Sequence, residues 1–128
     1  MKVDYSTPSK TMSPIGPYSH ISRAGNFITI GAVAGVDPAT GQIVTGGIEA
    51  ETRQILQAFS EMLSSVGSDM DHILHINVFL KNMSHFDEMN AAYVSVMGPR
   101  RPARTVVSVC DVPKHGALLT MNLTAVVK

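Results

Sequence analysis

Arg104 is the side chain in this sequence whose surroundings most favour chemistry with an anion. It follows a proline and an alanine, and it begins the apolar run Thr105-Val106-Val107-Ser108-Val109. An arginine there is either a surface charge at a strand end or a planar pair of donors facing a pocket. Frequency favours the surface interpretation, because arginines are rarely buried without a partner. In a pocket, the guanidinium would suit a carboxylate or a phosphate.

The histidines and the cysteine show no arrangement typical of a metal or nucleophile site. His72 and His75 are three residues apart, so on a strand they would point to opposite faces. The other histidines are scattered, and Cys110 is the only cysteine. No spacing typical of zinc ligands, of a phosphate-binding glycine loop or of a nucleophilic triad is present. The sequence therefore predicts no metal and no other cofactor.

Composition and charge narrow the class of protein. The 128 residues suit one domain over residues 1–128, and 45% of them are apolar. Ten basic residues balance ten acidic ones, which argues against a dedicated nucleic-acid binder. The N-terminus lacks the apolar core of a signal peptide, and the longest apolar run, 27–36, is too short to span a bilayer. With its single cysteine, the chain is predicted to be cytoplasmic and without membrane contact.

The elements that must position Arg104 follow the order strands, helix, strand, helix, strands. Strands are predicted over 18–23, 27–33, 71–81, 104–110 and 118–127, with a tight turn at 37–41. Apolar residues at helical spacing predict a helix over 48–66, which Gly67 can end. A capping box at 84–87 predicts the start of a second helix, which Gly98-Pro99 stops. This order predicts an α+β fold, a sheet with both helices on one face.

The second face of that sheet needs an explanation, because the helices can cover only one. It carries apolar, threonine and asparagine side chains and little charge. Either other subunits cover it, or it is the half-solvated face of an antiparallel sheet. In the strand 71–81, Leu74 is expected on the same face as Ile76, Val78 and Leu80.

Seven short stretches, in order over the whole chain, resemble the patterns of one protein family. They are Gly16-Pro17-Tyr18-Ser19-His20 (GPYSQ/H), Asp37-Pro38-Ala39-Thr40-Gly41 (DPxTG), Ala50-Glu51-Thr52-Arg53-Gln54 (AQTRQ), Val78-Phe79-Leu80-Lys81-Asn82-Met83 (VFLxDM), Phe86 with Asn90 and Tyr93 (FxxxNxxY), Pro102-Ala103-Arg104-Thr105 (PAR[ST]) and Val112-Pro113-Lys114 (LPK). Taken together they are highly specific. The chain resembles the RidA/YjgF family, also labelled L-PSP endoribonuclease.

This resemblance implies a fold, an assembly and an activity. The fold is chorismate-mutase-like, a mixed sheet with two helices, and the assembly is a homotrimer around a central barrel with pockets at subunit interfaces. The best-known members hydrolyse imines and enamines of 2-amino acids to 2-oxo acids and ammonia. By the same resemblance Arg104 grips the substrate carboxylate, Tyr18 and Asn90 line or support the pocket, and backbone donors near Val106 add hydrogen bonds.

Three positions depart from the typical deaminase of the family. Ile30 replaces a serine before Gly31, and Val106 replaces a cysteine two residues after the arginine. Counted from Pro113, Leu119 occupies the position of the glutamate that positions the attacking water, and the segment 117–123 contains no acid. Arg104, Val106, Ile30, Gly31 and Leu119 are therefore expected to contact a substrate more apolar than usual.

Two functions remain open at this stage. The first is a RidA-like hydrolase with weakened or altered deaminase activity, since positioning alone still accelerates hydrolysis. The second is a non-catalytic trimer that binds a small carboxylate metabolite or regulates a partner enzyme. The neutral net charge argues against the endoribonuclease label.

Overall fold

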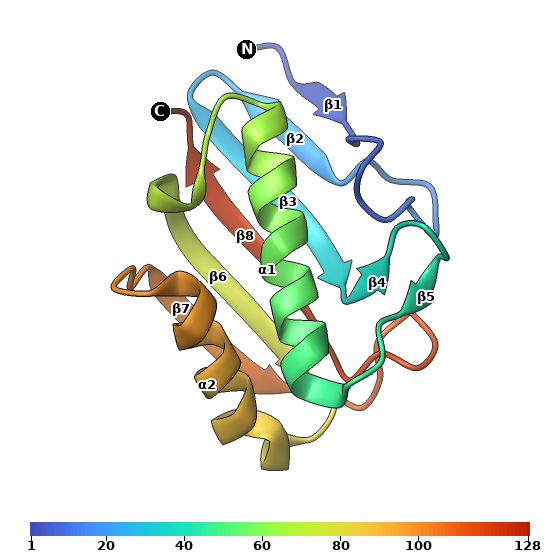
Figure 1. Cartoon of the computed structure of the whole chain (residues 1–128). Helices are drawn as coiled ribbons and strands as arrows, with labels where there is room; N and C mark the ends of the chain where they lie inside the picture. The colour runs from blue at the N-terminus through green and yellow to red at the C-terminus, as the bar shows by residue number, and fades with distance from the viewer.

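A six-stranded mixed sheet forms the centre of the computed structural model, which describes residues 1–128 (Figure 1). Its strand order is β1-β2-β3-β8-β6-β7. These strands are β1 (Asp4–Ser6), β2 (Ile21–Ala24), β3 (Phe27–Ala34), β6 (Ile73–Leu80), β7 (Ala103–Ser108) and β8 (Leu119–Val126). Only β6 and β7 run parallel, and the chain crosses between them through a helix. The order of elements agrees with the α+β prediction.

The helix α1 (Gly47–Ser65) ends as the sequence predicts. Gly67 has φ +80° and donates from its backbone N–H to the carbonyl of Ser64, while the N–H of Ser68 reaches the carbonyl of Leu63. These two bonds form a Schellman motif, which needs a residue with positive φ and therefore favours glycine. The predicted turn at 37–41 is also present, and it joins the short strands β4 (Val36–Asp37) and β5 (Gln42–Ile43).

The helix α2 (Phe86–Met97) begins differently from the prediction. A single 3-10 turn, Met83–His85, precedes it, and the side chain of Asn82 accepts the N–H of Ser84 at 2.9 Å. His85 is the N-cap residue and makes no side-chain capping bond. The predicted capping box at 84–87 is therefore wrong, because the capping side chain is Asn82, which accepts the Ser84 N–H at the start of the 3-10 turn.

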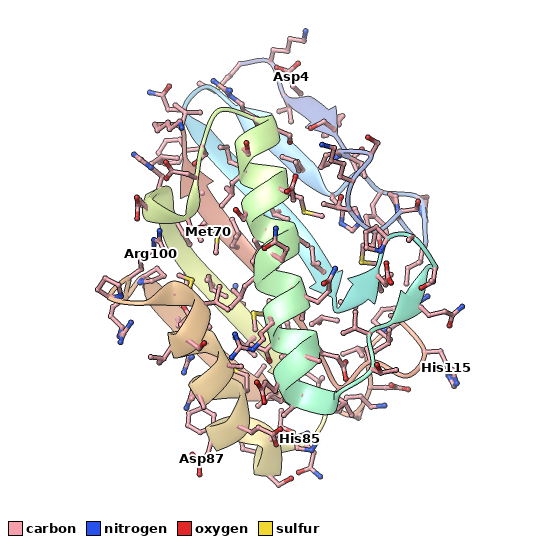
Figure 2. All side chains as sticks on the ribbon, in the orientation of Figure 1. Asp4, Met70, His85, Asp87, Arg100 and His115 are labelled. Carbon is pink, nitrogen blue, oxygen red and sulfur yellow. The ribbon has the colours of Figure 1, made fainter.

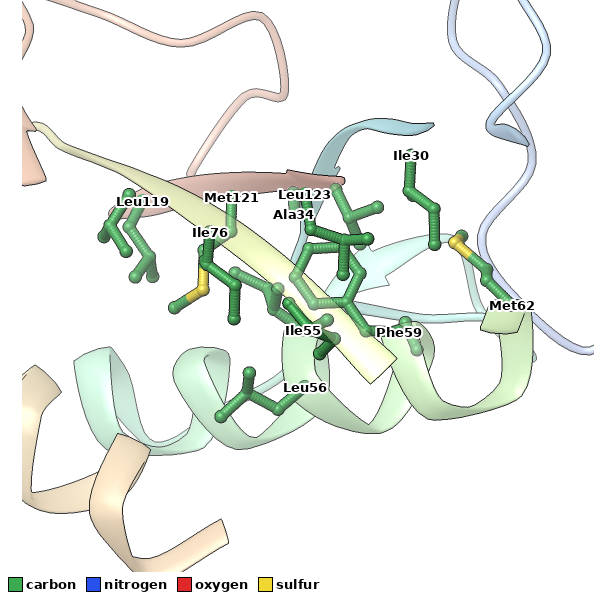
Figure 3. Packing of buried hydrophobic residues seen from close by; sticks show 14 of the residues in the cluster. Ile30, Ala34, Ile55, Leu56, Phe59, Met62, Ile76, Leu119, Met121 and Leu123 are labelled. Atoms are coloured by element: carbon green, nitrogen blue, oxygen red, sulfur yellow. The ribbon is translucent and has the colours of Figure 1, made fainter. Parts of the chain in front are cut away.

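Both helices lie on one face of the sheet, and the core fills the space between (Figure 1). Ile55, Phe59 and Met62 of α1 point toward the buried side chains of β3, β6 and β8 (Figure 3). The prediction for Leu74 is wrong: Ile73 is buried, whereas Leu74 is 47% exposed. The pairing register of β6 with β8 shifts between Ile73 and His75, and this irregularity turns Leu74 out of the core.

No helix covers the other face of the sheet, which we call the open face. It presents Thr105 and Val107 of β7, and Asn77 of β6 donates to Asn122 of β8 at 2.8 Å. Phe27 and Val107 remain 65% and 39% exposed. The structure thus confirms the layer order predicted from the sequence. None of the helices is long and apolar enough to cross a membrane.

Candidate functional site

Arg104 lies at the second position of β7, the edge strand next to β6. Its side chain is directed to the side of the sheet that α2 covers, because it contacts residues of that helix. Asn90 and Tyr93 are three residues apart on α2, a spacing that puts two side chains on one helix face. The three-residue spacing therefore places the Asn90 amide and the Tyr93 ring beside the guanidinium of Arg104.

The guanidinium of Arg104 is oriented but carries no neutralising partner. Its Nη2 donates to Oδ1 of Asn90 at 2.7 Å, and its Cζ lies 4.7 Å from the centroid of the Tyr93 ring. No carboxylate oxygen lies within ion-pair distance of Arg104. An oriented, half-buried cation without a counter-charge is chemically suited to an anion.

A cavity of about 510 Å³ opens beside this guanidinium, and we call it the arginine pocket. It is lined by Asn90, Tyr93, Val94, Arg101, Pro102 and Arg104. Tyr93 is buried and its hydroxyl has no hydrogen-bond partner. Burial raises the pKa of Tyr93, while the positive charges of Arg104 and Arg101 act in the opposite direction. The pocket is therefore polar, cationic and free of acids.

A second cavity, of about 530 Å³, surrounds Tyr18, and we call it the tyrosine pocket. It is lined by Met12, Ile15, Gly16, Pro17, Tyr18, Ser19, Gly31, Ala32, Ala34, Pro113, Lys114 and Thr120. The hydroxyl of Tyr18 accepts the backbone N–H of Ile15 at 3.2 Å. The Tyr18 ring meets the buried His20 ring edge-on, with centroids 5.4 Å apart. Burial lowers the pKa of His20, against a smaller opposing effect of the Met12 backbone.

Ile30 and Leu119 do not line either cavity. Both side chains are 0% exposed, and both belong to the hydrophobic core (Figure 3). This placement corrects the expectation that they contact the substrate: alternation along a strand directs them toward the helices. The half-buried Val106 also packs against the core, whereas Gly31 lines the tyrosine pocket.

Thr120 is the residue of β8 that lines the tyrosine pocket, and counting from Pro113 missed it. Its neighbour Leu119 faces the core, and in a strand consecutive side chains point to opposite faces. The alternation in the sequence carries this signal, since Leu119, Met121 and Leu123 form the apolar set and Thr120 belongs to the other. A shift of one residue is enough to exchange the two faces.

The two pockets are separate within one chain. Arg104 and Asn90 belong to the arginine pocket at the β7 edge, and Tyr18 belongs to the tyrosine pocket beside β3. Strands β8 and β6 lie between β3 and β7 in the sheet. The structure therefore brings together Arg104 and Asn90, as the sequence predicts, but it does not bring Tyr18 to them. No group of three or more His, Cys, Asp or Glu side chains is arranged to hold a metal ion.

Comparison with known proteins decides the family. The family model described as Endoribonuclease L-PSP matches residues 8–127, nearly the whole chain. The chain belongs to the RidA/YjgF family. The seven short stretches of this RidA/YjgF chain, and Asn90, Tyr93 and Arg104 among them, all lie within the matched residues.

Relatives with curated names support this RidA/YjgF assignment. A RutC family protein of Pyrococcus horikoshii is 41% identical over 101 residues, which cover 79% of this chain and 80% of the relative. The human 2-iminobutanoate/2-iminopropanoate deaminase is 30% identical over 118 residues, 92% of this chain and 85% of the relative. The crystal structure of YyfA from Yersinia pestis, a protein of the conserved Rid family, has a TM-score of 0.91 at 28% identity and covers 98% of this chain and 100% of its own.

Proposed function

We propose that this protein hydrolyses imine or enamine derivatives of 2-amino acids, and that Arg104 holds the substrate carboxylate. The observation that carries the proposal is the oriented guanidinium without a counter-charge in the arginine pocket. The names of the human and mouse relatives, deaminases of 2-iminobutanoate and 2-iminopropanoate, support the reaction class. In the reaction, water adds to the imine carbon, the carbon–nitrogen bond breaks, and nitrogen leaves as ammonia from a 2-oxo acid.

We also propose that the complete site needs two chains of a homotrimer. Two observations support this assembly: the tyrosine pocket and the arginine pocket are separate within one chain, and the open face exposes Phe27 and Val107. A neighbouring copy would add its tyrosine pocket to the arginine pocket of the first. The ligand would then meet a cation from one chain and Tyr18 with Thr120 from the other.

The activation of water is the part of this site that differs most from the family pattern. Neither pocket is lined by an aspartate or a glutamate, and Thr120 occupies the pocket-facing position of β8. Apolar and glycine residues dominate the lining around Thr120. We therefore propose slow hydrolysis driven by positioning and by the arginine charge, with a preference for a substrate whose uncharged part is apolar.

Arg104→Gln tests the carboxylate grip. The variant removes the charge while keeping a long polar side chain, so it should weaken binding of pyruvate by about a hundredfold and leave folding intact. Calorimetric titration with pyruvate measures the affinity, and the release of 2-oxo acid from imines generated in situ measures the activity. Arg53→Gln is the matched control, since Arg53 pairs with Glu49 on the exposed side of α1. Equal affinity of Arg104→Gln and wild type would identify Arg104 as a structural cation.

A non-catalytic carboxylate-binding trimer is the second candidate. The absence of an acid from both pockets favours it. The same two measurements separate the candidates, because a binding protein would bind pyruvate through Arg104 without accelerating imine hydrolysis.

A further inference from the structure

The arginine pocket contains two guanidinium groups. Besides Arg104, it is lined by Arg101, whose Nη1 donates to the backbone carbonyls of Gly98 and Arg100. The donors on Nε and Nη2 of Arg101 make no hydrogen bond within the chain, and an arginine has five N–H donors in all. Arg101 thus keeps unused donors at the wall of the cavity.

The neighbouring Arg100, in contrast, has both an ion-pair partner and a backbone acceptor. Its Nε lies 2.6 Å from Oδ1 of Asp71, and its Nη1 donates to the carbonyl of Met97. Figure 2 shows Arg100 beside the segment that carries Met70, away from the lower turns of α2. Neither Arg101 nor Arg104 has such a carboxylate.

Two like charges at one cavity define the ligand that fits it. Arg104 lies over the Tyr93 ring, with its Cζ 4.7 Å from the ring centroid, and Arg101 lines the same cavity. Their mutual repulsion is relieved most by a ligand with two negative groups, because each group can then accept charge-assisted hydrogen bonds from one arginine.

We propose that the substrate of this protein derives from an acidic amino acid, with its α-carboxylate on Arg104 and its side-chain carboxylate on Arg101. This inference rests on the proposed function, which makes the substrate a 2-amino-acid derivative. Among the ordinary amino acids, a second carboxylate is the only anionic group that such a derivative carries at neutral pH. Arg101 is then the specificity-determining residue of the pocket, and the carbon chain between the carboxylates is its apolar part.

A matched pair of 2-oxo acids tests the proposal. 2-Oxoglutarate and 2-oxopentanoate have the same number of carbons and differ in the second carboxylate. Calorimetric titration of the full chain should show about tenfold tighter binding of 2-oxoglutarate. Arg101→Gln should abolish this preference while changing the affinity for 2-oxopentanoate by less than about twofold. The preference should also shrink with added salt, because Arg101 is exposed.

Arg100→Gln is the control, because it removes the same charge from the adjacent position outside the pocket. It should leave the preference for 2-oxoglutarate unchanged. If wild type binds both acids equally, or if Arg101→Gln weakens both equally, the second carboxylate has no site and the inference is overturned, while the Arg104 proposal stands. If neither acid binds at millimolar concentration, the proposed function itself fails and the inference fails with it.

Discussion

Leu119 and Thr120 are consecutive residues with opposite surroundings. Leu119 is 0% exposed among the core side chains, and Thr120 lines the tyrosine pocket. A carboxylate introduced at Leu119 would lose its hydration without gaining a partner. A carboxylate at Thr120 would instead reach the tyrosine pocket.

Thr120→Glu is expected to raise imine hydrolysis by roughly tenfold to a hundredfold, the lower part of the range for a general base. Because position 120 is only 6% exposed, the new carboxyl group should have a raised pKa, so the rate should climb with pH as it ionises. Initial rates of 2-oxo acid release from about pH 6 to about pH 9 measure both effects, because burial can raise the pKa of a glutamate into this range. Thr120→Gln, equal in length and without charge, is the control.

Leu119→Glu is expected to lower the free energy of unfolding by about 3 kcal/mol, since it buries an unpaired acid. Urea unfolding measures this loss. A Leu119→Glu protein as stable as wild type would contradict the orientation of β8 described above.

The contact between Arg104 and Asn90 is the part of the candidate site that the sequence predicts best. Arg104 and Asn90 belong to short motifs with fixed spacing. Arg104 lies on a strand and Asn90 on a helix, and in such regular elements the spacing along the sequence determines the direction of each side chain. Counting from Pro113 along a loop does not tell which face of β8 Leu119 takes, and the place of Ile30 before Gly31 does not tell which face of β3 Ile30 takes. Arg101 has no motif, and only the cavity associates it with Arg104.

Glu51 connects the N-terminal part of α1 to the residue that precedes β8. Its Oε1 accepts the backbone N–H of Leu118 at 2.8 Å, and the residue is 2% exposed. The helix approaches β3 so closely here that a Cβ on Gly35 would lie 2.7 Å from Cα of Glu51. Burial raises the pKa of Glu51, against the Leu118 hydrogen bond and the charge of His85. The family pattern that this stretch resembles has glutamine at the same position.

Glu51→Gln is expected to raise stability at neutral pH, because glutamine keeps the acceptor for Leu118 and removes the cost of a buried charge. The raised pKa of Glu51 means that its contribution to stability is complete below its ordinary value of 4.5 and is lost as pH rises through the folded-state value. The stability gain of the variant should therefore vanish toward pH 4.5 and grow above it. Urea unfolding of both proteins over this range measures the difference, and a gain independent of pH would contradict the assignment.

Periodic elements were predictable and their irregular parts were not. The apolar spacing of α1 and the glycine after it predict the helix to within a few residues. By contrast, the register shift in β6 that exposes Leu74 depends on pairing with β8. The residues of β6 alone do not predict this pairing. The strands β1, β4 and β5 have two or three residues each, too few for a periodicity to be seen.

At the scale of the molecule, the open face is the feature that one chain leaves unexplained. Thr105, Val107 and Phe27 lie exposed on β7 and β3. A half-solvated sheet would tolerate the threonine, but Phe27 at 65% exposure favours a covered surface. The homotrimer of the proposed function would cover it.

Light scattering should give a mass about three times the 13.7 kDa of one chain. Val107→Asp on the open face should lower this mass at micromolar concentration, because it would bury an unpaired charge between subunits. Gln57→Asp on the exposed side of α1 is the matched control and should leave the mass unchanged. A wild-type mass equal to one chain would refute the trimer.

In the proposed homotrimer, the separation of Arg104 from Tyr18 within one chain predicts that two inactive variants can restore activity when they assemble together. Suppose that one variant lacks the arginine half of the site and another lacks the tyrosine half, so that each alone forms an inactive trimer. When the two are folded together, every mixed ring has one junction at which an intact arginine half meets an intact tyrosine half. Two inactive alleles would then complement each other in the same cell, and the restored activity would follow the proportion of mixed rings.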